Sequence, residues 1–206
     1  MPRSRSARLL IVVLVAIAAG GRAVAQHQAA PAAAASHKHY VMPADDRSQT
    51  SPTGAVAPRL QNLGSYAFPV TTRNAQAQLF INQGLNLSYA FNHAEAGRAF
   101  REAARLDPDC AMAFWGQALV LGPNINATMD RGDESPAYAA IQKALALKSK
   151  ASARERAYID ALAMRYTGKA GDRQAQDRAY SVAMGKVHEQ FPDDLDAATL
   201  FVESVM

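Results

Sequence analysis

The chain has 206 residues, 49% of them hydrophobic and 7% aromatic, and a formal net charge of +4 at pH 7. This length suffices for one sizeable core or a short series of repeated units, and it argues against two large domains. The single cysteine, Cys110, excludes an intramolecular disulfide bond, so packing alone must hold the fold together.

Residues 1–25 have the three parts of a secretory signal peptide. Arginines within residues 3–8 form a positive start, residues 9–19 form an apolar stretch too short to span a bilayer, and Ala-Val-Ala at 23–25 is a cleavage site. We expect cleavage after Ala25 and a mature chain that is periplasmic or secreted, without a membrane span.

The signal peptide carries the whole positive surplus of the chain. It contains four arginines and no acidic residue, so its removal lowers Lys plus Arg from 22 to 18, which equals the 18 Asp plus Glu. A mature net charge of zero, without a stripe of basic residues, argues against nucleic acid as a partner.

Residues 26–70 are predicted to be a disordered tether. The part up to about residue 58 mixes Ala, Pro, Ser, Thr and His with few large apolar side chains, so it cannot bury enough surface to offset the entropy of ordering. Four of its side chains belong to types that bind copper or zinc: His27, His37, His39 and Met42. A metal-handling role for this tail stays open as an alternative.

The first helical pattern begins at about residue 71. In AQAQLFINQGLNLSYAF, residues 75–91, large apolar side chains recur at spacings that largely fit one broad helix face, and Thr71 and Thr72 offer caps. A second helix follows almost directly. Asn92 suits its N-cap, with Glu95 three residues later as in a capping box, and the short link predicts an antiparallel pair of helices.

The same stretch contains the residue types of a zinc site, His93, Glu95 and Cys110. Zinc deaminases combine H-x-E with P-C-x-x-C, but the second thiol is missing here because Ala113 holds its place. His93 and Cys110 would also lie at opposite ends of a helix, about 20 Å apart at 1.5 Å per residue. No other catalytic or cofactor motif occurs, so we predict no metal site, no cofactor and no enzymatic activity.

Small and large residues recur along the chain with a period of 34 residues. The first unit has them at Phe80, Gly84, Leu87, Ala96, Phe100, Ala103 and Pro108. Phe114, Ala118 and Leu121 repeat the first three one period later, and residues 122–136 form an inserted loop before the next helix. A third helix pair is predicted within residues 151–192. Asp193, Asp194 and Asp196 then mark the start of a further helix rather than general acids.

These intervals resemble the tetratricopeptide repeat family, and one departure is Gln83, at a position usually held by Leu. The stretches INQGLNLSYAFNHAEAGRAF, LDPDCAMAFWGQAL and LGPNIN are similar to a group of exported bacterial members whose biochemical activity is not settled. The resemblance covers residues 60–206 and implies an all-α fold, an α-α superhelix of antiparallel helix pairs. Residues 71–206 would form about three pairs and a truncated helix, to be completed by further repeats or by a partner.

The resemblance also implies a concave, largely apolar groove that binds a protein or peptide partner. Its lining residues would be Gln78, Ile81, Leu85, Ser88 and Tyr89 in the first repeat, and Met112, Trp115, Leu119, Gly122 and Pro123 in the second. The same spacing also fits an inter-repeat core, so both interpretations stay open. In the inserted loop, Asn124 and Asn126 are further candidate binding residues.

We therefore expect an exported scaffold that mediates protein-protein interaction through this groove and the inserted loop. An apolar groove without Lys or Arg favours an extended or helical apolar peptide over a chain-terminal carboxylate. The alternative is a metal-handling or enzymatic envelope protein that uses the His-bearing tail or a missing C-terminal part.

Overall fold

The computed structural model describes residues 54–168 and 171–206, which all belong to one compact unit. These residues form helices and loops without a strand, which confirms the predicted all-α class. The elements are α1 (Ala75–Tyr89), α2 (His93–Leu106), α3 (Ala111–Leu119), α4 (Glu134–Leu147), the 3-10 turn η2 (Lys148–Lys150), α5 (Ala153–Ala163), α6 (Arg173–Gln190) and α7 (Leu195–Val205). The predicted signal peptide and the His-bearing tail lie outside the described residues.

Asn, Ser and Asp side chains cap the N-termini of most of these helices. Asn92 caps α2 as predicted, and Ser152 with Glu155 forms a complete capping box at α5. The first helix differs from the prediction, because Asn74 caps α1 and accepts hydrogen bonds from the backbone of Gln76 and Ala77. At α7 the cap is Asp194, within the acidic cluster that the sequence placed at a helix start.

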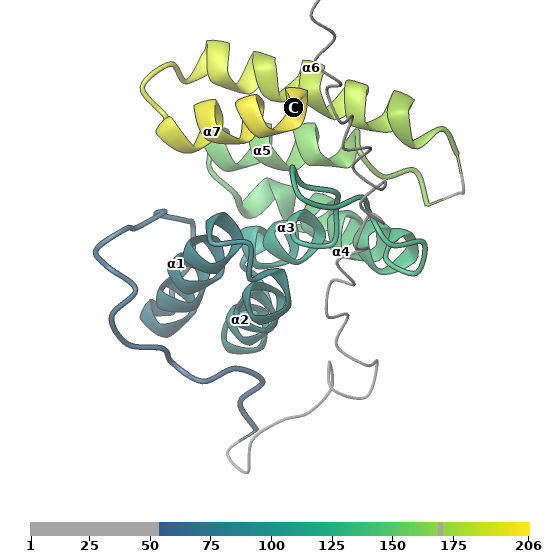
Figure 1. Cartoon of the computed structure of the whole chain (residues 1–206). Helices are drawn as coiled ribbons and strands as arrows, with labels where there is room; N and C mark the ends of the chain where they lie inside the picture. Colours follow the sequence, from purple (N-terminus) through teal and green to yellow (C-terminus); the bar gives the residue numbers. More distant parts are fainter. Residues whose placement is uncertain (1–53, 169–170) are drawn as a thin grey trace, which may run out of the picture. The chain divides into compact units, whose positions relative to one another are not determined.

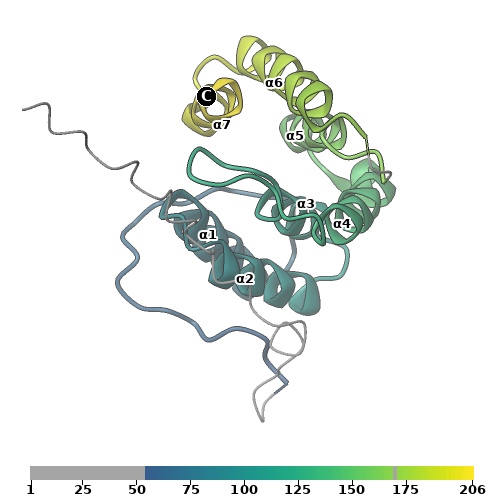
Figure 2. The same cartoon turned by 45° about the vertical axis from the view of Figure 1, so that its right-hand side comes forward.

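Consecutive helices pack as antiparallel neighbours, and α1, α3 and α5 also contact one another in succession (Figure 1). Figure 2 shows α1 with α2, α3 with α4, and α6 with α7 as adjacent pairs. In this arrangement α1, α3, α5 and α7 alternate with α2, α4 and α6. The odd-numbered helices can therefore contribute side chains to a common face, which we call the odd-helix face.

Two glycines explain how closely the helices approach. The ring of Phe100, on α2, lies where a Cβ would project from Gly84 of α1 and from Gly116 of α3. An added Cβ would come within 2.6 Å of Phe100 at Gly84 and within 2.3 Å at Gly116. Gly84, the small residue of the first repeat unit, and Gly116, outside the repeat pattern, thus leave the space that the Phe100 ring fills against α1 and α3.

Residues 54–70 correct the prediction of a disordered tether for this part of the chain. They pack against α1 and α2. The Val56 amide donates a hydrogen bond to Glu102, and the Val56 carbonyl accepts one from Arg98. Gln83, only 1% exposed, accepts from the Leu60 amide at 2.9 Å. The departure from the repeat pattern at Gln83 is explained, because its amide binds a segment that Leu could not bind.

The second repeat also differs from the expected groove. The helix α3 ends at Leu119, so Gly122 and Pro123 lie in the loop that follows it and not on a groove-lining helix. Proline lacks the amide hydrogen that a continuing helix needs and restricts the preceding residue, which accounts for the early end. Among the helices of residues 54–168 and 171–206, none combines the length and hydrophobicity that crossing a membrane requires.

Candidate functional site

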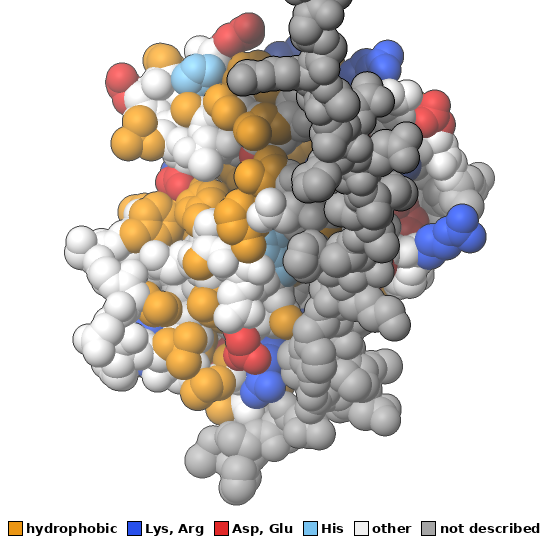
Figure 3. Space-filling model, in the orientation of Figure 1, with side chains coloured by type: hydrophobic (Ala, Val, Ile, Leu, Met, Phe, Trp, Pro, Cys, Tyr) orange, Lys and Arg blue, Asp and Glu red, His pale blue; other side chains and the backbone are white. Residues whose placement is uncertain are grey.

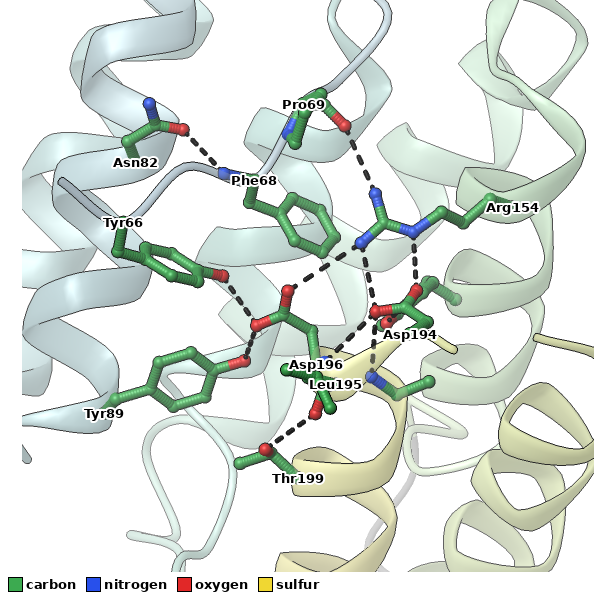
Figure 4. A network of polar contacts seen from close by, with 12 residues as sticks. Tyr66, Phe68, Pro69, Asn82, Tyr89, Arg154, Asp194, Leu195, Asp196 and Thr199 are labelled. Atoms are coloured by element: carbon green, nitrogen blue, oxygen red, sulfur yellow. Dashed lines mark hydrogen bonds and ion pairs between the residues drawn. The ribbon is translucent and has the colours of Figure 1, made fainter. Parts of the chain in front are cut away.

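An extended segment of the chain, residues 64–72, lies across the odd-helix face, and we call it the strap (Figure 4). Its anchor is Phe68, whose ring stacks on Trp115 of α3 with 6.1 Å between ring centroids. Tyr158 of α5 meets the same ring edge-on at 5.6 Å, and the Arg154 guanidinium lies 4.1 Å from its centroid. The aromatic ring is therefore enclosed by two helices and a cation.

Side chains of α1 and α5 bind the backbone of the strap. The Phe68 amide donates to Asn82 Oδ1 at 3.0 Å, and the Phe68 carbonyl accepts from Gln78 Nε2 at 2.8 Å. Gln78 Oε1 in turn accepts from the Val70 amide at 2.9 Å. These contacts go to peptide groups, so they recognise an extended backbone whatever its side chains are.

A charged pair on α5 continues this pattern at the end of the strap. Arg154 Nη1 donates to the Pro69 carbonyl at 3.4 Å, and Glu155 Oε1 accepts from the Thr71 amide at 2.6 Å. The Thr71 hydroxyl donates to the other oxygen of Glu155 at 2.5 Å. The arginine thus binds a backbone carbonyl of the strap, and the carboxylate binds a backbone N–H two residues later.

Two aspartates at the start of α7 complete the network around the strap. Asp196 Oδ1 accepts from the hydroxyls of Tyr66 and Tyr89 at 2.6 and 2.7 Å. Asp194 accepts from Arg154 Nε at 2.5 Å and from the Tyr158 hydroxyl at 2.8 Å. Burial and the nearby aspartates raise the pKa values of Tyr66, Tyr89 and Tyr158 above their ordinary value, so these phenols stay protonated and donate.

Several of the residues predicted to line the groove are core residues in this structure. Ile81, Leu85, Met112 and Trp115 are buried, and the strap occupies the surface next to Trp115. Of the two interpretations that the spacing allowed, the structure places these four in the core. Gln78 does bind an extended peptide, but the peptide is the strap.

A second part of the odd-helix face is open, beside α7, and we call it the open pocket. This cavity of about 280 Å³ includes four predicted groove residues, Ser88, Tyr89, Leu119 and Pro123. Its other lining residues are Phe91, His93, Val120, Ile125, Arg165, Thr199, Leu200, Val202, Glu203 and Met206. Figure 3 shows hydrophobic side chains gathered between α7 and α1 on this side of the molecule.

The rim of the open pocket exposes large apolar side chains. Ile125 of the inserted loop is 48% exposed, and Val202 of α7 is 54% exposed. Phe91, also exposed, has a φ of 58°, in the left-handed region that normally favours glycine. A phenylalanine held at such a turn position, with its ring on an open cavity, marks the pocket as a candidate binding site.

Besides His93 and Tyr89, an arginine and a glutamate line the open pocket. Arg165 is 7% exposed, donates from Nε to Asp177 at 2.9 Å, and holds its guanidinium 4.5 Å from the ring centroid of Tyr180. Glu203 lies on α7, where burial raises the pKa of its carboxyl and Arg165 opposes that increase. The two side chains do not form an ion pair with each other among the described contacts.

The inserted loop covers a different cavity of about 310 Å³ between α2, α3 and α4. Asn124 lines it and shapes the loop, since its backbone pairs with Ala127 and its Oδ1 accepts from the Asn126 amide at 2.8 Å. Asn126 itself is exposed and lines neither cavity. Of the two asparagines predicted as binding residues, only Asn124 lines either of these two cavities.

In the part of the chain that the structure describes, no three His, Cys, Asp or Glu residues lie together as a metal ion would require. Cys110 is buried, and desolvation raises the pKa of its thiol to about 11, so it is protonated at neutral pH.

Sequence reasoning missed the residues that do the most at this site: Phe68, Arg154 and Asp196 at the strap, and Arg165 and Glu203 in the open pocket. A signal for the strap was present, because Tyr66, Phe68 and Pro69 stand out in a segment otherwise poor in aromatic residues. Asp196 belongs to the acidic cluster that the sequence placed at a helix start, and no local pattern signals Arg154, Arg165 or Glu203.

Comparisons of the chain with protein-family models, with curated proteins and with solved structures find no significant match. The candidate site therefore rests on the geometry and chemistry of the chain's own residues.

Proposed function

We propose that the chain is an exported, tetratricopeptide-like scaffold that binds an extended segment of another protein at the open pocket. The alternation of odd- and even-numbered helices and the glycine contacts of Phe100 support the repeat assignment. Export depends on residues 1–25 acting as a signal peptide, as their sequence predicts.

The observation that carries the proposal is how the strap is held. Gln78, Asn82, Arg154 and Glu155 bind its peptide groups, while Trp115 and Tyr158 enclose one aromatic side chain. The odd-helix face therefore has the chemistry to bind an extended peptide. The open pocket lies on the same face, shares Tyr89 with the strap network, and exposes apolar side chains that no described residue covers.

The size of the open pocket also favours a peptide segment. Its volume of about 280 Å³ is at or below the lower limit of the roughly 300–1,000 Å³ typical of small-molecule sites. Its rim comes from α7 and the inserted loop, so a partner would contact several elements around one anchoring side chain.

Selection from a displayed library of random peptides tests this function. The purified chain is compared with Ile125→Glu and Val202→Glu, which place a charge on the pocket rim, and with Val182→Glu as a matched control. Val182 is 58% exposed on α6 and does not line the pocket. We expect peptides that bind the wild type and Val182→Glu, and that lose about tenfold or more in affinity for the two rim variants.

If no selected peptide binds, or if all four proteins bind the same peptides equally, the open pocket is not the binding site. Circular dichroism of each variant confirms that a loss of binding does not reflect unfolding.

A further inference from the structure

The open pocket is lined by a hydrogen-bond donor, Arg165, and an acceptor, Glu203, which do not bind each other. Arg165 has five N–H donors and uses only Nε for a hydrogen bond within the described residues, to Asp177. Its side chain is only 7% exposed and lines the cavity. A ligand that accepts hydrogen bonds could therefore use the two terminal nitrogens of the guanidinium.

Glu203 presents the complementary chemistry. Among the described residues, its carboxyl group accepts no hydrogen bond and forms no ion pair. Two ionisable groups interact electrostatically with this carboxyl, Arg165 and Tyr180. The Tyr180 hydroxyl is buried and has no hydrogen-bond partner among the described residues. A ligand that donates a hydrogen bond would satisfy the carboxyl in the same cavity.

Charge restricts what that ligand can be. A carboxylate attracted by Arg165 would meet the charge of Glu203, and an ammonium attracted by Glu203 would meet Arg165. A neutral group with one acceptor and one donor avoids both penalties, and a peptide group has this composition. The rest of the lining is mostly apolar, with Phe91, Leu119, Ile125, Val202 and Met206, and it suits the side chain next to such a peptide group.

The strap shows the same recognition in the same molecule. Arg154 donates to the Pro69 carbonyl, and Glu155 accepts from the Thr71 amide, while the side chain of Phe68 is enclosed nearby. The open pocket likewise brings an arginine and a carboxylate, Arg165 and Glu203, to one cavity on the odd-helix face.

We infer that the open pocket selects an uncharged, extended partner segment, with one backbone carbonyl bound by Arg165, a backbone N–H bound by Glu203, and an apolar side chain on Ile125 and Val202. This inference rests on the proposed function and specifies the class of partner. It excludes a chain-terminal carboxylate or a lysine side chain as the group that enters the cavity.

The probes are the peptides enriched by the wild-type chain from the displayed library, resynthesised with both ends capped. Each backbone N–H is removed in turn by N-methylation, and each peptide is titrated against the wild type, Glu203→Ala and Val202→Glu. We expect uncharged peptides in which one N-methylation weakens binding to the wild type by about tenfold or more. The same change should weaken binding to Glu203→Ala by no more than about twofold, because the acceptor is already gone.

Two other outcomes separate the inference from the function on which it rests. Peptides that lose affinity for Val202→Glu but show no N-methylation coupled to Glu203, or that require a carboxylate or ammonium group, would overturn the inference and leave the binding site in place. Peptides that bind Val202→Glu as well as the wild type would overturn both. If Glu203→Ala folds poorly, Glu203→Gln replaces it. We then expect the N-methylation to weaken binding to Glu203→Gln less than binding to the wild type, by a smaller margin than with alanine.

Discussion

The ring of Phe68 lies parallel to the indole of Trp115, with an interplanar angle of 6° and 6.1 Å between centroids. Phe68 belongs to a segment without secondary structure, and Trp115 belongs to the middle of α3. This contact ties the strap to the helical core and makes the strap part of the folded unit. It also gives the strap a direct spectroscopic reporter, since Trp115 is the single tryptophan of the chain.

Replacing Phe68 by alanine should strongly destabilise the fold. The side chain is buried against Trp115 and Tyr158, and deletion of a buried phenylalanine costs about 3–5 kcal/mol. Urea unfolding measures the loss, and the fluorescence of Trp115 in the folded variant should shift to longer wavelength as water reaches the indole. The control Val182→Ala removes an exposed side chain and should change stability by less than about 0.5 kcal/mol. Equal stability of both variants would mean that the strap does not pack on the core.

Gly84→Ala and Gly116→Ala should each lower the free energy of unfolding by about 1–3 kcal/mol. Alanine in a helix is normally better than glycine by about 1 kcal/mol, but at these positions its methyl group would overlap the Phe100 ring. Gly132→Ala is the matched control, because no atom lies within 4 Å of the Cβ that it would add. Thermal unfolding of the three variants checks this, and a stabilised Gly84→Ala would show that α1 and α2 are not held this close.

The stability of the fold should depend on the ionisation of Asp194. Burial opposes ionisation of this carboxyl, but hydrogen bonds from Arg154 and Tyr158 outweigh it and hold the pKa below its ordinary value of 3.8. The folded state therefore favours the carboxylate, which contributes stability in full above the ordinary pKa and loses that contribution as pH falls through the folded-state pKa.

Asp194→Asn isolates this effect, since asparagine is an equally good N-cap for α7. We expect the variant to be less stable than the wild type at about pH 7, with the difference shrinking below about pH 4. Denaturant titrations over this range measure it. A difference that does not change with pH would show that the Asp194 charge contributes nothing to the network.

Glu203→Gln should raise stability at neutral pH. Burial raises the pKa of Glu203 above its ordinary value of 4.5, so the folded state holds its proton more tightly than the unfolded state does. Stability therefore falls as pH rises from below 4.5 through the folded-state pKa, and the ionised carboxyl destabilises the fold above that range. The Gln side chain removes this charge, so the melting temperature of the variant should exceed that of the wild type at about pH 7 and match it at low pH.

A lower melting temperature of Glu203→Gln at neutral pH would mean that the carboxylate has a stabilising partner. Gain of stability with loss of peptide binding would be the trade-off typical of a binding residue.

Cleavage of the leader should occur after Ala25. Expression in a bacterial host, followed by fractionation and intact-mass measurement, should give a mature chain that begins at Gln26 in the periplasm or medium. Ala25→Arg should block this processing, because the cleavage site requires small residues, whereas Gln26→Ser should leave it unchanged. Unprocessed wild-type protein in the cytoplasm would contradict export.

The helices and several of their ends could be predicted from local sequence. The apolar spacing around Phe80 and Phe100, the cap at Asn92 and the stop at Asp107-Pro108 act within a few residues, and α2 has these limits in the structure. The helix α3 ends at Leu119, close to the start of the loop predicted at residues 122–136, although the resemblance to the repeat family had assigned Gly122 and Pro123 to the groove.

The sequence by itself determined the all-α class, because a helix forms from periodicity and capping within one stretch of chain. Only the tertiary structure decided which apolar residues are core and which remain open. Ile81 and Trp115 are buried because the strap and neighbouring helices cover them, whereas Ile125 and Val202 stay exposed at the rim of a cavity. Burial depends on what else reaches the same place, and Tyr66 and Asp196, 130 positions apart, meet only after the whole unit has folded.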